Sequence, residues 1–336
     1  MGKNIQQTVG VIGSGSWATA MIKMLSDNTE TKELYWWVRK EEDINYINIY
    51  HHNPNYLSAV EIKLTPSHIS SSVKDVVENS DIIILNTPAA YLKQALQDIK
   101  AEDLIGKTIV SAIKGIIPDE NLIVGEYIST TYDVPLDHIV VVGGPCHAEE
   151  VSQEKLSYLT FGCSDTHRAS VVAALFKGRY INTIISADIL GIEYGAVLKN
   201  IYALAGGICH GLGYGDNFQA VLVSNAIREM EYLVNSIDQT ERNINASAYL
   251  GDLLVTAYSQ FSRNRTFGNM IGKGYSVKSA QLEMNMVAEG YYASACIQGI
   301  IKKYNLSMPI CDMVYEVLYN NKVVATEVAK LAQKLS

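Results

Sequence analysis

The residue with the clearest chemical potential is Lys199, which lies in a run of mostly apolar and very small residues at positions 191–216, GIEYGAVLKNIYALAGGICHGLGYGD. On a helix, Gly206 and Gly207 follow on the same side, so backbone or a ligand can approach this face closely. Burial disfavours the ammonium and lowers the pKa of a lysine, which suits Lys199 to exchange a proton near neutral pH. The plainer alternative is a lysine whose stem packs between helices and whose ammonium pairs with Glu193.

A second set of polar residues predicts a site for an anion. Lys114 follows an apolar run, where the carboxyl end of a parallel strand would present it to a ligand; otherwise it is a surface lysine in a loop. The segment 262–265, Ser-Arg-Asn-Arg, offers a hydroxyl, an amide and two guanidiniums, a composition suited to a phosphate held by two hydrogen bonds, although many such basic loops are only solvated. Asp252 is either a helix N-cap or the partner of a lysine ammonium. Glu289, by sequence alone, is an ordinary exposed carboxylate.

The N-terminal stretch predicts a turn that binds a dinucleotide. The apolar run 8–12 leads into Gly13-Ser14-Gly15-Ser16-Trp17-Ala18, and apolar residues then recur at helical spacing. In a strand, turn and helix of this kind, Gly13 makes the turn and Gly15 lets a pyrophosphate lie against the backbone. The helix N-terminus supplies N–H groups and a positive dipole.

The end of the second expected strand bears on the choice of cofactor. The run 33–38 is followed by Arg39, where a site that prefers NAD would usually carry an acidic residue for the ribose 2′-hydroxyl. A guanidinium there suits a 2′-phosphate, and Glu41 and Glu42 follow too late to be ribose ligands. The sequence therefore favours NADPH while allowing NADH, unless Arg39 is simply a solvated strand end.

Composition excludes several classes of protein. The 336 residues are too many for one ordinary core, and a net charge of −8 argues against a general surface for nucleic acid or anionic membrane. The five cysteines show no C-x-x-C spacing, and the seven histidines form no known ligand pair, so neither a disulfide framework nor a metal site is expected. No secretory leader or bilayer-spanning run is evident, so we expect a cytoplasmic protein without stable membrane insertion.

The expected elements change character once along the chain. Apolar runs at 8–12, 33–38, 81–85, 108–112, 139–142 and 158–162 have the spacing of strands in a wound sheet. Beyond about residue 186 helical periodicity takes over. The predicted fold is therefore α/β: a Rossmann-like N-terminal domain with a wound, mostly parallel sheet over residues 1–186, then an all-α domain for substrate binding and dimerisation over 187–336.

Seven motifs, in order and over nearly the whole chain, resemble those of the bacterial-type NAD(P)-dependent glycerol-3-phosphate dehydrogenases: GSGSWATA, IKG, GGPCHAEE, GAVLKNIYALAGGICHGLGYGDN, GDLLVT, SRNRTFG and VAEG. The resemblance implies a homodimer that reversibly reduces dihydroxyacetone phosphate, a phosphorylated ketone, to sn-glycerol 3-phosphate for phospholipid synthesis, with NADP or NAD as cofactor. In that family the lysine corresponding to Lys199 exchanges the proton with the substrate.

Matching each motif extends the resemblance to individual residues. Catalytic roles fall on Lys199, Lys114 and Asp252. The implied cofactor contacts are Gly13, Gly15, Ser16, Trp17, Arg39, Lys114, Ala148, Arg263, Val287 and Glu289. The implied substrate contacts are Lys114, Gly144, Cys146, Lys199, Asp252, Ser262, Arg263 and Asn264. Cys146 and His147 depart from the family, which usually has Ser or Thr and then Phe, so substrate affinity is affected more than reaction type.

Two other functions stay open on the sequence. One is a reductase of the same two-domain plan that acts on a β-hydroxyacid or ketopantoate, whose substrates end in a carboxylate; the segment 262–265 favours phosphate instead. The other is a non-catalytic nucleotide sensor, which would have no need of Lys114 and Lys199.

Overall fold

The computed structural model describes residues 7–28, 31–284 and 288–336. Its internal contacts define two compact units. Unit 1 comprises Met1–Thr87, Tyr91–Ile113 and Val124–Ile189, and unit 2 comprises Pro88–Ala90, Lys114–Ile123 and Leu190–Ser336. Two short pieces of the N-terminal half thus belong with the C-terminal helices, and the boundary at residues 186 and 187 stays a prediction.

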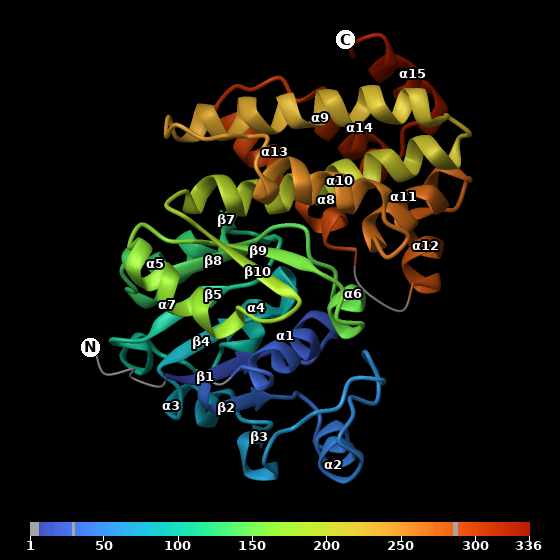
Figure 1. Cartoon of the computed structure of the whole chain (residues 1–336). Helices are drawn as coiled ribbons and strands as arrows, with labels where there is room; N and C mark the ends of the chain where they lie inside the picture. Colours follow the sequence, from blue (N-terminus) through green and yellow to red (C-terminus); the bar gives the residue numbers. More distant parts are fainter. Residues whose placement is uncertain (1–6, 29–30, 285–287) are drawn as a thin grey trace. The chain divides into compact units, whose positions relative to one another are not determined.

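Unit 1 is built on one eight-stranded sheet with the order β10-β9-β8-β5-β4-β1-β2-β3 (Figure 1). Every neighbouring pair is parallel except β8 and β9, which are antiparallel. The strands are β1 (Gln7–Ile12), β2 (Thr31–Trp37), β3 (Ile69–Ser70), β4 (Ile82–Leu85), β5 (Thr108–Ser111), β8 (Ile139–Gly143), β9 (Ser157–Gly162) and β10 (Ile181–Ser186). The order reverses beside β1, which is the arrangement of a Rossmann-type sheet.

Helices connect these strands, as a parallel sheet requires. They are α1 (Ser16–Ser26), α2 (Glu41–Tyr50), α3 (Val73–Glu78), α4 (Leu92–Ala95), α5 (Val124–Tyr132), α6 (Ala148–Ser152) and α7 (Thr166–Phe176). Four short 3-10 turns complete the connections: Pro66–His68, Ala89–Tyr91, Ala101–Leu104 and Leu136–His138. The central strands β4 and β5 are buried along their whole length, which is why they read as continuous apolar runs rather than as alternating ones.

In its described part, unit 2 is helical apart from one two-stranded hairpin, β6 (Ile116–Ile117) with β7 (Leu122–Ile123). Its helices are α8 (Ile189–Gly211), α9 (Asp216–Ile237), α10 (Asp252–Tyr258), α11 (Arg263–Gly272), α12 (Val277–Glu283), α13 (Glu289–Lys303), α14 (Pro309–Leu318) and α15 (Val324–Ala332). A π-helical turn, Ser247–Gly251, leads into α10. Helix α8 is buried at every position from 191 to 209, so it is the core helix of this unit.

Helices α8 and α11 pack backbone against backbone. A Cβ added to Gly207 would lie 2.1 Å from the carbonyl oxygen of Arg265, and one added to Gly268 would lie 2.2 Å from that of Leu204. No side chain larger than hydrogen fits at either position without moving a helix. This contact fixes the start of α11 against α8, the helix that carries Lys199.

A buried carboxylate joins α9 to α14. The two oxygens of Glu229 accept hydrogen bonds from the backbone N–H groups of Ile310 and Cys311, each at 3.1 Å, in the first turn of α14. These N–H groups have no partner within their own helix, and the helix dipole favours a negative charge there. Glu229 is therefore the cap that positions α14.

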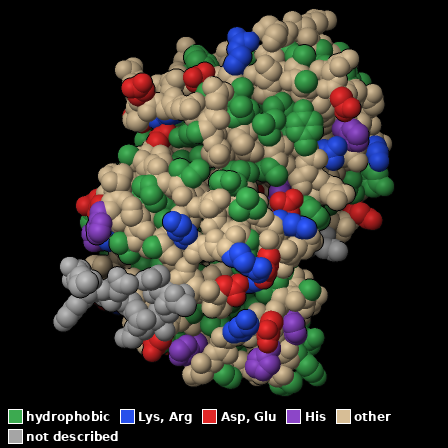
Figure 2. All heavy atoms as spheres, in the orientation of Figure 1, with side chains coloured by type: hydrophobic (Ala, Val, Ile, Leu, Met, Phe, Trp, Pro, Cys, Tyr) green, Lys and Arg blue, Asp and Glu red, His purple; other side chains and the backbone are tan. Residues whose placement is uncertain are grey.

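The fold predicted from the sequence is confirmed: a mostly parallel wound sheet precedes a helical C-terminal region. The sequence patterns did not indicate the two edge strands β3 and β10 or the hairpin. Among the described residues, no helix combines the length and the apolar character needed to cross a bilayer. On the face drawn in Figure 2, Lys and Arg side chains are interspersed with Asp and Glu.

Candidate active site

The centre of unit 2 holds a buried ion pair. Lys199 and Asp252 retain only 4% and 2% of their side-chain exposure, and the Lys199 ammonium donates a hydrogen bond to Oδ1 of Asp252. The two residues are 53 positions apart, and the π-helical turn Ser247–Gly251 delivers Asp252 as the first residue of α10. Of the alternatives open on the sequence, Asp252 therefore binds the lysine, and the N-cap of α10 is Gly251.

A second cation shares this carboxylate. Nζ of Lys114 lies 3.9 Å from Oδ2 of Asp252, and its side chain is 19% exposed. The segment that carries Lys114 is held from α8, because Nδ2 of Asn200 donates a 3.0 Å hydrogen bond to the Lys114 carbonyl oxygen. Asn200 is thus a structural partner of Lys114, a contact that the sequence patterns did not reveal.

Glu289, the first residue of α13, also belongs to this cluster. Its Oε1 accepts a 3.3 Å hydrogen bond from the backbone N–H of Ala89. Burial raises the pKa of Glu289, while the Ala89 N–H and the charges of Arg263, Lys114 and Lys199 lower it. Glu289 is therefore no ordinary surface carboxylate. Three cations face two carboxylates, which leaves one net positive charge when all are ionised.

The predicted phosphate segment forms the N-terminus of α11. Ser262 is the N-cap, and its hydroxyl accepts a 3.3 Å hydrogen bond from the Arg265 N–H. Asn264 is buried, and its Oδ1 accepts a 2.9 Å hydrogen bond from the Gly290 N–H, which ties the start of α11 to the start of α13. The segment is therefore an ordered helix N-terminus rather than a solvated basic loop.

The environment of Lys199 changes its protonation. Burial lowers the pKa of Lys199 from its ordinary value of 10.5 to about 7, Lys114 acts in the same direction, and Asp252 opposes the change. A lysine in this state takes up and releases a proton at neutral pH, which is the property required of a general acid and base.

Unit 1 contains the predicted glycine turn between β1 and α1. Gly13 has φ of +136°, and a Cβ there would lie 2.5 Å from the carbonyl oxygen of Asn86, so only glycine fits. Gly15 is the N-cap of α1 and meets nothing within 4 Å of its would-be Cβ. The turn is tight on one side and open on the other, as a pyrophosphate-binding turn must be. Ser16 and Trp17 follow as the first residues of α1.

Buried polar atoms lie at the carboxyl ends of the two central strands. Nδ2 of Asn86 and Oγ1 of Thr87 follow β4, and Oγ of Ser111 ends β5; these three atoms lack a hydrogen-bond partner among the described residues. Carboxyl ends of parallel strands are where dinucleotides bind, and polar atoms there are suited to ligand contacts. The open glycine turn and these atoms therefore fit a nicotinamide dinucleotide.

The side chains after β2 bear on the choice between NADPH, which carries a 2′-phosphate, and NADH. Arg39 is exposed at the end of this strand. Of the two carboxylates that follow, Glu41 accepts a hydrogen bond from the Ser71 hydroxyl, and Glu42 pairs with Lys40 at 3.0 Å. Both carboxylates have protein partners, and their exclusion as ribose ligands stays a prediction.

Three more predicted residues surround the turn after β8, in unit 1. Gly144 has φ of +104°, and its would-be Cβ lies 2.8 Å from the Tyr158 carbonyl oxygen. Cys146 is buried, and Ala148 begins α6. Val287, a predicted cofactor contact, lies outside the described residues.

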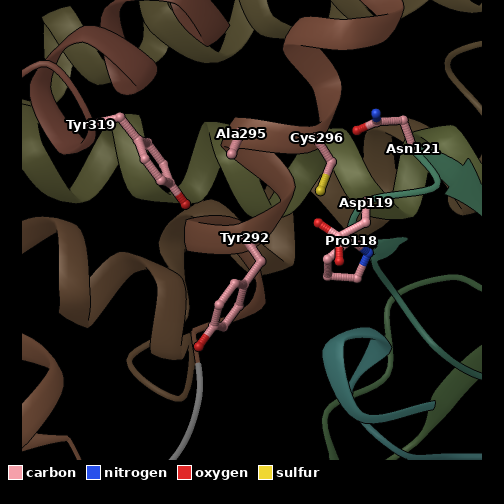
Figure 3. Close-up of a pocket in the computed structure, with 7 residues that line it drawn as sticks. All are labelled: Pro118, Asp119, Asn121, Tyr292, Ala295, Cys296 and Tyr319. Carbon is pink, nitrogen blue, oxygen red and sulfur yellow. The ribbon is translucent and has the colours of Figure 1, made fainter. Parts of the chain in front are cut away.

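A pocket of about 290 Å³ opens elsewhere in unit 2, between the hairpin segment and α13 (Figure 3). It is lined by Pro118, Asp119, Asn121, Tyr292, Ala295, Cys296 and Tyr319. None of these is a predicted site residue, so the charged cluster rather than this pocket marks the candidate active site. Within residues 7–28, 31–284 and 288–336, no group of three or more His, Cys, Asp or Glu side chains is arranged to hold a metal ion.

Together, the Rossmann-type sheet and its glycine turn define a dinucleotide-binding protein, and unit 2 adds a cluster suited to proton exchange. Comparison with known families specifies the class. The model of the NAD-dependent glycerol-3-phosphate dehydrogenase N-terminus matches residues 8–169, and that of the C-terminus matches residues 188–329. The chain belongs to this family, and the resemblance seen in its motifs is confirmed.

Individual relatives agree. Glycerol-3-phosphate dehydrogenase [NAD(P)+] of Bacillus subtilis is 36% identical over 327 residues, which cover 96% of this chain and 93% of the relative. The protein of the same description from Agathobacter rectalis is 32% identical over 325 residues, covering 96% and 95%. The crystal structure of glycerol-3-phosphate dehydrogenase from Coxiella burnetii has the same fold, with a TM-score of 0.89, 23% identity and coverage of 97% and 99%.

Proposed function

We propose that this chain catalyses the reversible reduction of dihydroxyacetone phosphate by NAD(P)H, giving sn-glycerol 3-phosphate. The observation that carries the proposal is the buried pair of Lys199 and Asp252 in the same unit as a basic helix N-terminus. Membership of the family indicates the substrate. The site carries groups suited to both ends of that substrate: a proton donor for the carbonyl and cations for the phosphate.

Lys199 is proposed as the proton donor in reduction and the acceptor in oxidation. When bound, the dinucleotide supplies the hydride to the carbonyl carbon or removes it from the alcohol carbon. As negative charge develops on the carbonyl oxygen, Lys199 transfers its proton to that oxygen and becomes the neutral amine. Asp252 keeps the ammonium oriented, and Lys114 adds positive charge where the alkoxide forms.

The phosphate is proposed to bind at the N-terminus of α11. Arg263 is half-buried there and carries the guanidinium fork that matches a phosphate, while the helix dipole adds a positive potential. Because Oδ1 of Asn264 is engaged with Gly290, the Nδ2 group of the same amide is the side that would donate to a phosphate oxygen. The net positive charge of the cluster favours a dianionic phosphate over a neutral alcohol.

The remaining site roles follow from the family resemblance. We propose that Ser16, Trp17, Ala148, Val287 and Glu289 contact the cofactor, and that Gly144, Cys146 and Ser262 contact the substrate. Arg39 is proposed to bind a 2′-phosphate, which makes NADPH the preferred cofactor. We further propose a cytoplasmic homodimer that provides glycerol 3-phosphate for phospholipid synthesis, with residues 1–186 as the dinucleotide domain and 187–336 as the helical domain.

The direct test follows nicotinamide absorbance with purified full-length protein. We expect oxidation of NADPH, faster than of NADH, with dihydroxyacetone phosphate and no oxidation with unphosphorylated dihydroxyacetone. Oxidation with ketopantoate or a β-ketoacid instead would assign the chain to the carboxylate reductases of the same two-domain plan. Equal rates with both ketones would remove the phosphate role of α11.

A further inference from the structure

The glycine turn is held from behind by three side chains. Trp36, from β2, donates from Nε1 to the Gly13 carbonyl oxygen at 2.7 Å, and this contact is buried. Asn53, from the segment after α2, donates from Nδ2 to the Ser14 carbonyl oxygen at 3.1 Å. Thr19 of α1 donates from Oγ1 to the Gly15 carbonyl oxygen at 3.0 Å. We call Thr19, Trp36 and Asn53 the carbonyl bracket.

Asn53 is the residue on which the bracket depends. It is 3% exposed, and Nδ2 also donates to Oγ1 of Thr19 at 2.9 Å, so one amide group links two members. Its Oδ1 accepts from the backbone N–H groups of Asn55 and Tyr56, at 3.0 and 3.1 Å. All four hydrogen-bonding positions of the amide are therefore used, and its orientation is fixed.

The bracket sets the direction of the turn's N–H groups. A trans peptide is planar, and its N–H points opposite to its carbonyl oxygen. Fixing the carbonyls of residues 13, 14 and 15 therefore aims the N–H groups of residues 14, 15 and 16 to the other side of the turn. Donors that are aimed in advance bind an anion without the cost of ordering them at the moment of binding.

We propose that Thr19, Trp36 and Asn53 are positioning residues for the cofactor, and that they act by preorganising the N–H groups that receive its pyrophosphate. This inference rests on the proposed function, because it assumes that a nicotinamide dinucleotide occupies the turn. Each bracket residue acts through the backbone of residues 13–15. Affinity for ligands that contain a pyrophosphate depends on the bracket, whereas affinity for the adenosine moiety alone does not.

The experiment compares adjacent tryptophans. Trp36→Phe removes the N–H that binds the Gly13 carbonyl, and Trp37→Phe removes one that binds the Ser71 carbonyl at 2.9 Å, away from the turn. Kd is measured by ligand-observed NMR titration for ADP-ribose, which contains the pyrophosphate, and for adenosine, which lacks it. We expect Trp36→Phe to raise the Kd for ADP-ribose by about five- to tenfold, which is the effect of leaving one buried acceptor unpaired, and to leave the Kd for adenosine unchanged. Trp37→Phe leaves the Kd for both ligands unchanged.

A second pair tests the amide. Asn53→Ala removes the bracket contact, and Asn55→Ala removes only an exposed hydrogen bond from Nδ2 to Oδ1 of Asp43, at 3.1 Å. Equal ADP-ribose affinity in each variant and its control would refute the proposed role of the carbonyl bracket. An equal loss of affinity for adenosine would also refute it, because it would indicate a general disturbance of the fold. If Asn53→Ala does not fold, the tryptophan pair still decides. Failure of the wild-type protein to bind ADP-ribose would instead refute the proposed function.

Discussion

Replacing Asp252 by Asn tests the protonation of Lys199 most directly. The change keeps the shape of the side chain but removes the negative charge that the buried ammonium contacts. Two unit charges about 4 Å apart interact by about 4 kcal/mol at an effective dielectric constant near 20, and this corresponds to roughly 3 pH units of pKa. The pKa of Lys199, already lowered to about 7 by burial, therefore falls far below neutrality in the variant.

The consequence is a change in the pH profile of ketone reduction. In the proposed mechanism reduction requires the ammonium, so we expect kcat/KM for the wild type to be flat at low pH and to fall as pH rises through about 7. In Asp252→Asn the protonated fraction at about pH 7.5 drops from roughly a quarter to below one in a thousand, and kcat/KM falls by about 10²- to 10³-fold. Between about pH 6 and 9 the variant loses its inflection, and kcat/KM falls tenfold per pH unit throughout.

The assay is the initial rate of NADPH oxidation at limiting dihydroxyacetone phosphate across this pH range. Glu327→Gln is the matched control, because it removes one carboxylate from an exposed ion pair with Lys330 in the same unit. An inflection near pH 7 that persists in Asp252→Asn, or a loss of less than about tenfold at pH 7.5, would refute the assigned electrostatics.

Four further outcomes are expected. Lys199→Ala abolishes turnover while NADPH binding, measured by calorimetry, stays within about twofold; wild-type turnover would remove its role as proton donor. Arg263→Ala raises KM for dihydroxyacetone phosphate by at least about tenfold, and an unchanged KM would disprove the phosphate contact. Gly268→Ala lowers the free energy of unfolding by about 3 kcal/mol or more, because its Cβ would lie 2.2 Å from an α8 carbonyl oxygen. The control Gly299→Ala, whose Cβ meets the nearest atom at 3.4 Å, causes no such loss, and urea unfolding compares the two variants. Burial raises the pKa of Glu229 to about 7, so the folded state keeps a proton that the unfolded chain loses near pH 4.5, and stability falls as pH rises between these values. Glu229→Gln flattens the slope of Tm against pH in this range, and parallel profiles of Tm against pH in variant and wild type would contradict the assignment.

The sequence predicted the local parts of the site because local patterns govern them. A short apolar run followed by Gly13 and Gly15 dictates strand, turn and helix, and the small residues around Lys199 indicate a tightly packed helix. These small residues also predicted that backbone or a ligand would approach Gly206 and Gly207. At Gly207 the neighbour is backbone, that of α11, whereas at Gly206 it is the side chain of Gln219, which is neither of the predicted neighbours.

Tertiary structure decided how distant residues combine. Nothing near Lys199 in the sequence identifies Asp252 as its partner rather than Glu193, because Asp252 lies 53 positions further on and the chain between them must first fold into α9 and the π-helical turn. Likewise, Lys114 follows a strand of unit 1 but belongs to unit 2, where Asn200 holds its carbonyl.

The glycine turn shows the same division within one feature. Gly13 is readable in the sequence because its φ of +136°, which other residues rarely adopt, restricts the choice of residue at once. The side chains that hold the carbonyls of the turn come from 23 and 39 positions away, and Asn53 lies in a segment with no local pattern that marks it. The sequence thus determined which backbone a dinucleotide would meet, and only the packing of β2 and the segment after α2 against that turn decided how its N–H groups are aimed.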